Sequence, residues 1–133
     1  MSGVAICRAL MASNAALAAV VPASKIQAGV IPLGTVLPAI SVTSISAQEQ
    51  NNVAMDGSPR LVSERVQVTV MAKTYTQQKQ LLTLVKAAVP NTYAVVATFQ
   101  CYSIIDDIEG PDIQDVDLVI YFQSADFNVR YVR

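Results

Sequence analysis

The sequence predicts an α+β domain in which two helices pack on one face of a mainly antiparallel sheet. Helical and strand periodicities follow one another in the order helix, strands, helix, strands. The final segment, Ser124 to Tyr131, alternates strictly between apolar and polar residues, which is typical of a half-buried strand. With 133 residues, the chain is expected to form a single domain over residues 1–133.

The first helix is expected from Gly3 to Val21, because its larger apolar residues share one face of a helical wheel. Alanines line the opposite face around Arg8. That face either contacts solvent or packs closely against a neighbouring subunit, and periodicity does not separate the two. Pro22 is expected to end the helix because it has no amide proton to donate.

The next 37 or so residues combine turns, one strand and a polar loop. Glycine and proline recur from Lys25 to Pro38, which favours short extended pieces and turns. Ala39 to Ser46 is expected to form a strand with a bulge near Thr43, where the apolar alternation changes phase. Ala47 to Pro59 is polar and has few apolar anchors, so a flexible loop or long hairpin tip is expected at 47–59. Contact with a partner can offset the entropy of ordering it.

A strand followed by a capped helix occupies the middle of the chain. Glu64 to Ala72 alternates, with its valines on the inner face. Thr74 and Gln77 match the capping box that starts a helix, and Pro90 is expected to stop that helix. The helix is expected to gather these residues on one broad apolar face: Tyr75, Leu81, Leu82, Leu84, Val85, Ala88 and Val89.

The remaining strands enclose an acidic segment. Tyr93 to Ile105 is rich in β-branched and aromatic residues and is expected to be a strand, and Leu118 to Val132 completes the sheet. Asp106 to Asp117 is expected to be a turn. It holds six of the ten acidic residues: Asp106, Asp107, Glu109, Asp112, Asp115 and Asp117.

The composition favours contact with other protein. Charged residues make up 14% of the chain and hydrophobic residues 53%, which is unusually apolar for a globular domain. We expect a partner or further copies of the chain to cover some apolar surface, while alanine accounts for part of the excess. The net charge of −1 and the scattered basic residues argue against a groove that grips nucleic-acid phosphates.

The N-terminal stretch and the cysteines give evidence on the cellular compartment of the chain. Ser13 and Asn14 interrupt the apolar stretch, and prolines break every candidate membrane span, so a soluble, cytoplasmic chain without membrane contact is expected. Cys7 and Cys101 lack a CxxC spacing, so buried free thiols are favoured over a disulfide. Their redox state stays open.

The sequence predicts no catalytic, metal or cofactor residue. It lacks histidine, the most common general acid–base near neutral pH, which argues against an enzyme. The acidic turn does not continue into the ligand spacing of a calcium loop, so a solvated hairpin tip is favoured over a metal site. Glycine-rich phosphate motifs are also missing.

Four stretches give the chain a recognisable layout: ICRALMASNAALAAVV, LPAISV, RVQVTVMAKTYTQQKQLLTLVKAAV and VDLVIYFQSADFNVRYV. Together they cover most of the sequence. The layout resembles the tail-completion or tail-terminator proteins of long-tailed bacteriophages.

The resemblance implies a structural virion protein that is assembled in the host cytoplasm. It implies a ring, a hexamer in this family, at the head-proximal end of the tail tube, where it stops tube polymerisation and docks to the head-side connector. The implied partners are further copies of the chain, the tail tube protein and the connector protein. DNA would pass through the lumen without sequence-specific binding.

We expect the polar loop and the acidic turn to make contacts with other subunits or with the tube. The expected contact residues are Arg8, Gln50, Asn51, Asn52, Val53, Met55, Asp106, Asp107, Glu109 and Asp112. Carboxylates near a lumen would repel passing DNA. Two other functions stay open: a head-closure or neck ring protein, and a cytosolic small-ligand-binding module, which would need a convergent polar pocket.

Overall fold

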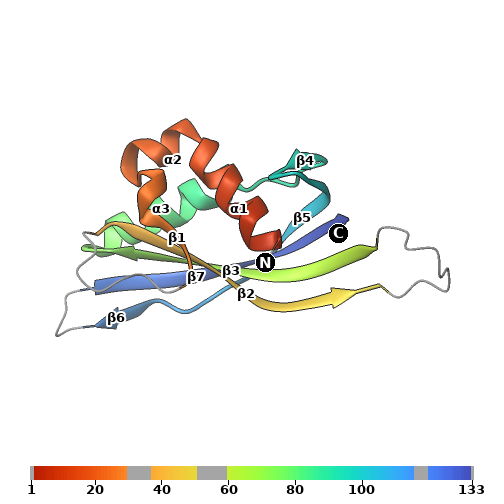
Figure 1. The fold of residues 1–133 in the computed structure, drawn as a ribbon. Helices are drawn as coiled ribbons and strands as arrows, with labels where there is room; N and C mark the ends of the chain where they lie inside the picture. The colour runs from red at the N-terminus through yellow and green to blue at the C-terminus, as the bar shows by residue number, and fades with distance from the viewer. Residues whose placement is uncertain (1, 30–36, 51–59, 116–119, 133) are drawn as a thin grey trace.

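A computed structural model of the chain describes residues 2–29, 37–50, 60–115 and 120–132. These residues form three α-helices and seven strands, and Figure 1 shows the helices on one side of a curled sheet. The elements are α1 (Ser2–Ser13), α2 (Ala15–Val20), the 3-10 helix η1 (Ala23–Lys25), β1 (Ile26–Ala28), β2 (Ala39–Glu49), β3 (Leu61–Ala72), α3 (Tyr75–Ala88), β4 (Ala94–Val96), β5 (Phe99–Glu109), β6 (Ile113–Asp115) and β7 (Ile120–Val132).

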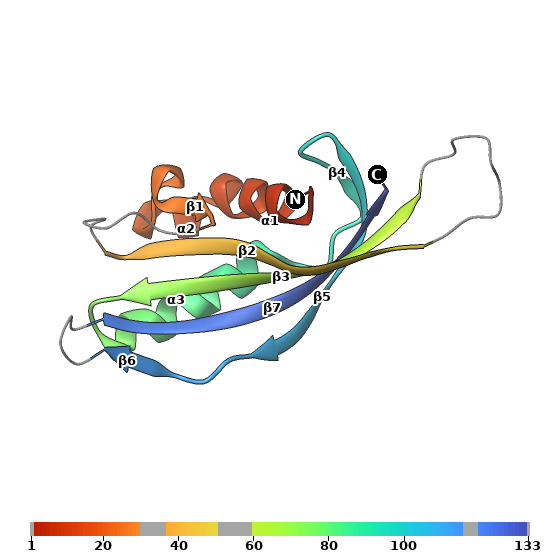
Figure 2. The same cartoon turned by 60° about the horizontal axis from the view of Figure 1, so that its bottom comes forward.

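The strands follow the order β1-β2-β3-β7-β5-β4, and β6 also pairs with β7. Strand β1 runs parallel to β2, whereas every other pair among the described strands is antiparallel. The sheet is therefore mixed, with an antiparallel majority. Because β5 and β6 pair with successive parts of β7, they lie end to end along the same edge (Figure 2).

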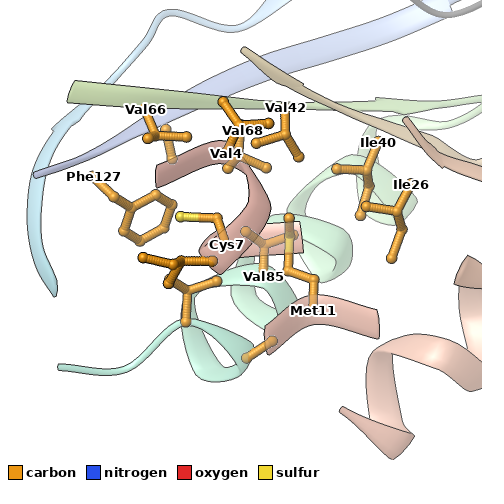
Figure 3. Close-up of a cluster of buried hydrophobic side chains, with 14 of the residues drawn as sticks. Val4, Cys7, Met11, Ile26, Ile40, Val42, Val66, Val68, Val85 and Phe127 are labelled. Atoms are coloured by element: carbon orange, nitrogen blue, oxygen red, sulfur yellow. The ribbon is translucent and has the colours of Figure 1, made fainter. Parts of the chain in front are cut away.

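The core lies between the helices and the inner face of the sheet. Buried and half-buried residues alternate along the whole of β3, with Val66 and Val68 pointing inward. The register places Val66 opposite Phe127 and Val68 opposite Ala125 of β7. The alternation predicted for both strands is confirmed. Figure 3 shows the helical side chains that meet this face, including Val4, Cys7, Met11 and Val85.

The single N-terminal helix predicted from Gly3 to Val21 is wrong, because the chain breaks at Asn14 into α1 and α2. The Asn14 side chain accepts a hydrogen bond from the amide of Leu17 at 3.0 Å and so caps the start of α2. Val20, expected on the buried face, is 42% exposed. The apolar residues keep nearly the same spacing across the break, so periodicity alone did not reveal it.

The predicted start of α3 is confirmed, with one change in the cap. Thr74 Oγ1 accepts a hydrogen bond from the Gln77 amide at 3.1 Å, whereas Gln77 Oε1 accepts from the Lys73 amide at 3.2 Å, one residue before the N-cap. Tyr75 was expected to be buried but is 49% exposed, and Gln78 is fully buried instead.

Strand β2 extends beyond its predicted end. The bulge lies at Ile45, between Ser44 and Ser46 in the register and close to the expected position at Thr43. Pairing then continues to Glu49, so 47–49 belong to the strand and not to the expected loop. Residues 51–59 of that loop lie outside the described part of the chain.

The strand expected from Tyr93 to Ile105 is wrong, because this stretch contains the hairpin of β4 and β5. The two loop residues, Ala97 and Thr98, have φ values of 52° and 70°, as a two-residue hairpin turn of type I′ requires. Neither residue is glycine or asparagine, so the turn carried no sequence signal. Strand β5 then continues to Glu109, which places the first half of the expected acidic turn inside a strand.

Candidate interaction surface

The acidic residues lie along one edge of the sheet and not in a single turn. Asp106, Asp107 and Glu109 are exposed residues of β5, and Asp112 follows in the connection to β6. The expected turn from Asp106 to Asp117 is therefore wrong in its first half, because pairing with β7 extends the strand. Residue 117 lies outside the described residues.

Asp112 connects this edge to helix α3. Its Oδ1 lies 2.7 Å from Lys79 Nζ, and its Oδ2 accepts a hydrogen bond from the Tyr75 hydroxyl at 2.8 Å. The hydrogen bond from Lys79, and then the one from Tyr75, lower the pKa of Asp112 below its ordinary value. Lys79 Nζ also donates to Gln123 Oε1 at 3.0 Å, so one ammonium group joins α3, β7 and the acidic segment.

The other acidic side chains of β5 also face cations. Glu109 forms an ion pair with Lys86 of α3 on the inner side of the sheet. On the outer side, Arg65 Nε lies 3.7 Å from Asp107 Oδ2 and 2.9 Å from Asp126 Oδ2. The hydrogen bond to Asp126 raises the pKa of Arg65. The pairs with Lys86 and with Arg65 connect the edge strand β5 to α3 and β3, and solvent screening weakens the ion pairs that lie at the surface.

Asp106 differs from its neighbours because its carboxylate has no ion pair or hydrogen bond with the described residues. Its register partner is Phe127, so its side chain leaves β5 on the same side as the helices. The negative charge of Asp106 is therefore not neutralised by a cation of the described residues.

Arg8 and Gln50 lie elsewhere on the domain. Arg8 is exposed on α1, and its Nε donates to the main-chain oxygen of Ile26 in β1 at 2.8 Å. Gln50 is exposed just after β2, and its amide donates to the carbonyl of Leu61 at 2.9 Å. The structure thus separates the predicted contact residues into three places. The acidic edge holds Asp106, Asp107, Glu109 and Asp112 on β5 and its connection to β6. The basic edge is the β1 edge beside Arg8, and Gln50 lies at the end of the β2–β3 hairpin. The other predicted residues lie outside the described part of the chain: Asn51, Asn52, Val53 and Met55.

Sequence reasoning missed a buried carboxylate of β3, which lies against the start of α1. Glu64 is fully buried, and its Oε1 accepts a hydrogen bond from the Tyr131 hydroxyl at 3.0 Å. Gly3 makes this burial possible, since a Cβ there would lie 2.6 Å from Glu64 Oε2. The signal was present, because the inward alternation of Val66 and Val68 extends back to Glu64.

The cysteines are buried thiols within the core. Burial, followed by the nearby Cys101 and Glu64, raises the pKa of Cys7 to about 12. The pKa of Cys101 is also raised by burial. Thiols with raised pKa values make poor nucleophiles near neutral pH.

Along helix α3, little supports a small-molecule site. An open groove of about 490 Å³ runs along α3, but its lining residues all come from that one helix, so groups from different elements do not converge there. Among the described residues, no group of three or more His, Cys, Asp or Glu side chains is arranged to hold a metal ion. Within the same ranges, every helix is too short or too polar to cross a membrane.

Comparison with known proteins gives a matching family and solved structures of similar fold. A search of curated protein sequences finds no match. A chain in the solved structure "Virion of native gene transfer agent (GTA) particle" is 13% identical, with a TM-score of 0.69 over 98% of this chain and 94% of that chain. The profile of the family "Tail completion protein gp17" matches residues 4–121. The chain therefore belongs to the tail completion protein gp17 family and is a structural component of a phage tail.

Proposed function

We propose that copies of this chain form a ring, a hexamer, at the head-proximal end of the tail tube. The ring ends tube polymerisation and joins the tail to the head-side connector. The family match over residues 4–121 carries this proposal. The fold shared with a chain of a gene transfer agent virion supports it, since that chain belongs to a particle of many assembled proteins.

The surface chemistry agrees with a role in assembly. Exposed apolar side chains are spread over the β4–β5 hairpin and the β5–β6 edge, and they include Tyr93 at 74% and Val95 at 67% exposure. Large exposed apolar groups commonly mark contacts with other proteins. DNA passes through the lumen of the proposed ring without sequence-specific binding.

The first experiment tests the role of the β2–β3 loop. We propose that this segment, which includes residues 51–59, contacts the tail tube protein. Deleting Asn51 to Met55 should leave the fold intact, as judged by circular dichroism, while tails grow to abnormal lengths or fail to join heads. A Gly/Ser replacement of the same length serves as the control for loop length. Normal infectious particles from both variants would contradict the proposed loop contact.

A second experiment separates the terminator from a head-closure or neck ring protein. Particles assembled without the chain are examined by electron microscopy. Headless tails of uncontrolled length support the terminator, because tube growth then lacks its stop. DNA-free heads with tails of normal length would overturn it in favour of a neck ring.

A further inference from the structure

The two edges of the sheet carry charges of opposite sign. Strand β1 forms one edge, where Arg8 and Lys25 lie beside it. Strand β4 covers only the first residues of β5, so the rest of β5 and the connection to β6 form the opposite edge, with Asp106, Glu109 and Asp112. Opposite charges at opposite edges suit a contact that repeats head to tail.

The register follows one row of residues from the basic edge to Gly110 on the acidic edge. Ile26 pairs with Ile40, Ile40 with Val70, and Val70 with Gln123. Gln123 Nε2 then donates to the carbonyl of Gly110 at 2.9 Å. Asp106 lies off this row, opposite Phe127, four residues along β7 from Gln123. Four strand-to-strand steps of about 4.8 Å separate the edges by roughly 20 Å. That distance exceeds the screening length of about 10 Å at 0.1 M salt, so one edge cannot neutralise the other.

Both edges keep an unbalanced charge. Lys79 and Lys86 neutralise Asp112 and Glu109, but Asp106 has no cation partner among the described residues. No carboxylate of the described residues lies within ion-pair distance of Arg8 or Lys25. The charges also face the same side of the sheet, since Arg8 projects from α1 and Asp106 leaves β5 towards the helices.

Apolar groups accompany the charges at each edge. Ile105, Ile108 and Ile113 on the acidic edge are 52%, 56% and 43% exposed. On the basic edge, α2 ends in Val20, which is 42% exposed, and its exposed alanines allow close approach. A contact between the two edges would bury apolar surface around ion pairs and so strengthen them.

We propose that the basic edge of one copy, with Arg8 and Lys25, binds the acidic edge of a second copy, with Asp106 and Ile108. This inference rests on the proposed function and supplies its subunit contact. The occupant is a second copy because the two complementary surfaces lie on the same chain, which defines a heterologous contact that can close into a ring.

The contact uses side chains and not added strand pairing. Arg8 already occupies the main-chain oxygen of Ile26 on β1. On β5 the Ile104 amide donates to Asn91 Oδ1 at 3.1 Å. These side chains block part of each free strand edge, which protects it from unspecific pairing.

The test is a charge swap followed by sedimentation velocity at low salt over a range of concentrations. Lys25→Glu and Asp106→Lys each place like charges at the contact and should raise the dissociation constant at least about tenfold. Neither residue has an ion pair among the described residues, so both variants should fold. An equimolar mixture of the two variants, and the K25E/D106K chain, should regain association. Lys73→Glu, which makes the same charge change on an exposed turn, should associate like the unchanged protein.

Two results would overturn the inference. One is an unchanged protein that stays monomeric at its highest soluble concentration in low salt. The other is a ring that persists equally in K25E and D106K. In the second case the ring stands and only this contact is wrong, whereas the electron microscopy of particles without the chain tests the tail function separately.

Discussion

Among the described core residues, Gln78 has the most buried polar atoms without a hydrogen-bond partner. It is fully buried on α3, and neither its Nε2 nor its Oε1 has a hydrogen-bond partner within the described part of the chain. Burying an unpaired amide costs about 1–3 kcal/mol. Helical periodicity marked this face as apolar, but it gave no reason to place a glutamine there.

Replacing Gln78 with methionine should therefore stabilise the domain. Methionine fills a similar volume without the unpaired polar atoms, so the free energy of unfolding should rise by about 1–2 kcal/mol in urea denaturation. Gln80→Met, on the exposed side of the same helix, is the control and should change it by less than about 0.5 kcal/mol. A loss of stability in Gln78→Met would show that the amide is satisfied in solution.

Cys7 makes stability depend on pH on the alkaline side. Folding raises its pKa from 9.0 to about 12, so the folded state favours the neutral thiol. This contribution is fully present below pH 9.0 and is lost as pH rises towards about 12. Cys7→Val should flatten the fall in unfolding free energy over that range, measured by denaturation at successive pH values. An unchanged slope would contradict the assigned pKa.

At the level of elements, Thr74 sets the start of α3. Thr74→Ala removes the side-chain acceptor of the Gln77 amide and should lower the free energy of unfolding by about 1 kcal/mol. Thr76→Ala, two residues later on the exposed face, keeps the cap and is the matched control. Equal effects of the two substitutions would mean that the cap contributes little to stability.

Asp112 ties α3 to the connection between β5 and β6. Because Lys79 lowers its pKa, the stabilisation is present above the pKa of the unfolded chain and is lost as pH falls through the folded value. In Lys79→Met, NMR titration of the Asp112 carboxyl carbon should show its pKa rising towards the ordinary value. The Lys73→Met variant should leave the titration unchanged, and a shift there would point to a general charge effect.

The sequence predicted the strongly patterned elements but not the breaks between them. The strands around Val68 and Phe127 and the start of α3 at Thr74 follow from local alternation and capping chemistry. The hairpin loop at Ala97 and Thr98 does not, because both residues adopt positive φ and neither is the glycine or asparagine that marks such a turn in a sequence. The break at Asn14 was readable as a cap but was outweighed by the continuous apolar pattern.

At the level of the whole molecule, strand order decides where the contact residues lie. Strand β7 inserts between β3 and β5, which brings Asp126 beside Arg65 and Gln123 beside Lys79. Periodicity predicts strands but not their neighbours. The separation of Arg8 and the acidic residues onto opposite edges was therefore not predictable from the sequence, although each charge was visible in it.

The same strand order predicts which strands exchange their amide hydrogens most slowly. Strands β3 and β7 are paired on both sides, so their amides should exchange with deuterium only through global unfolding. Strand β4 and the half of β2 beyond Val42 have a single paired neighbour and should exchange faster. Equal rates in the central and edge strands would contradict this order of stability.

Assembly into a ring should then change the hydrogen-exchange protection of the two sheet edges alone. If opposite edges meet in the ring, exchange should slow on concentration at Lys25 to Ala28 and at Asp106 to Asp112, because these segments leave solvent together. The β4 hairpin tip at Ala97 and Thr98 should keep its rate, since it lies outside the proposed contact. Hydrogen exchange with mass spectrometry, compared between dilute and concentrated protein, measures both. Protection that grows at the hairpin and not at the edges would assign the subunit contact to Tyr93 and Val95 instead.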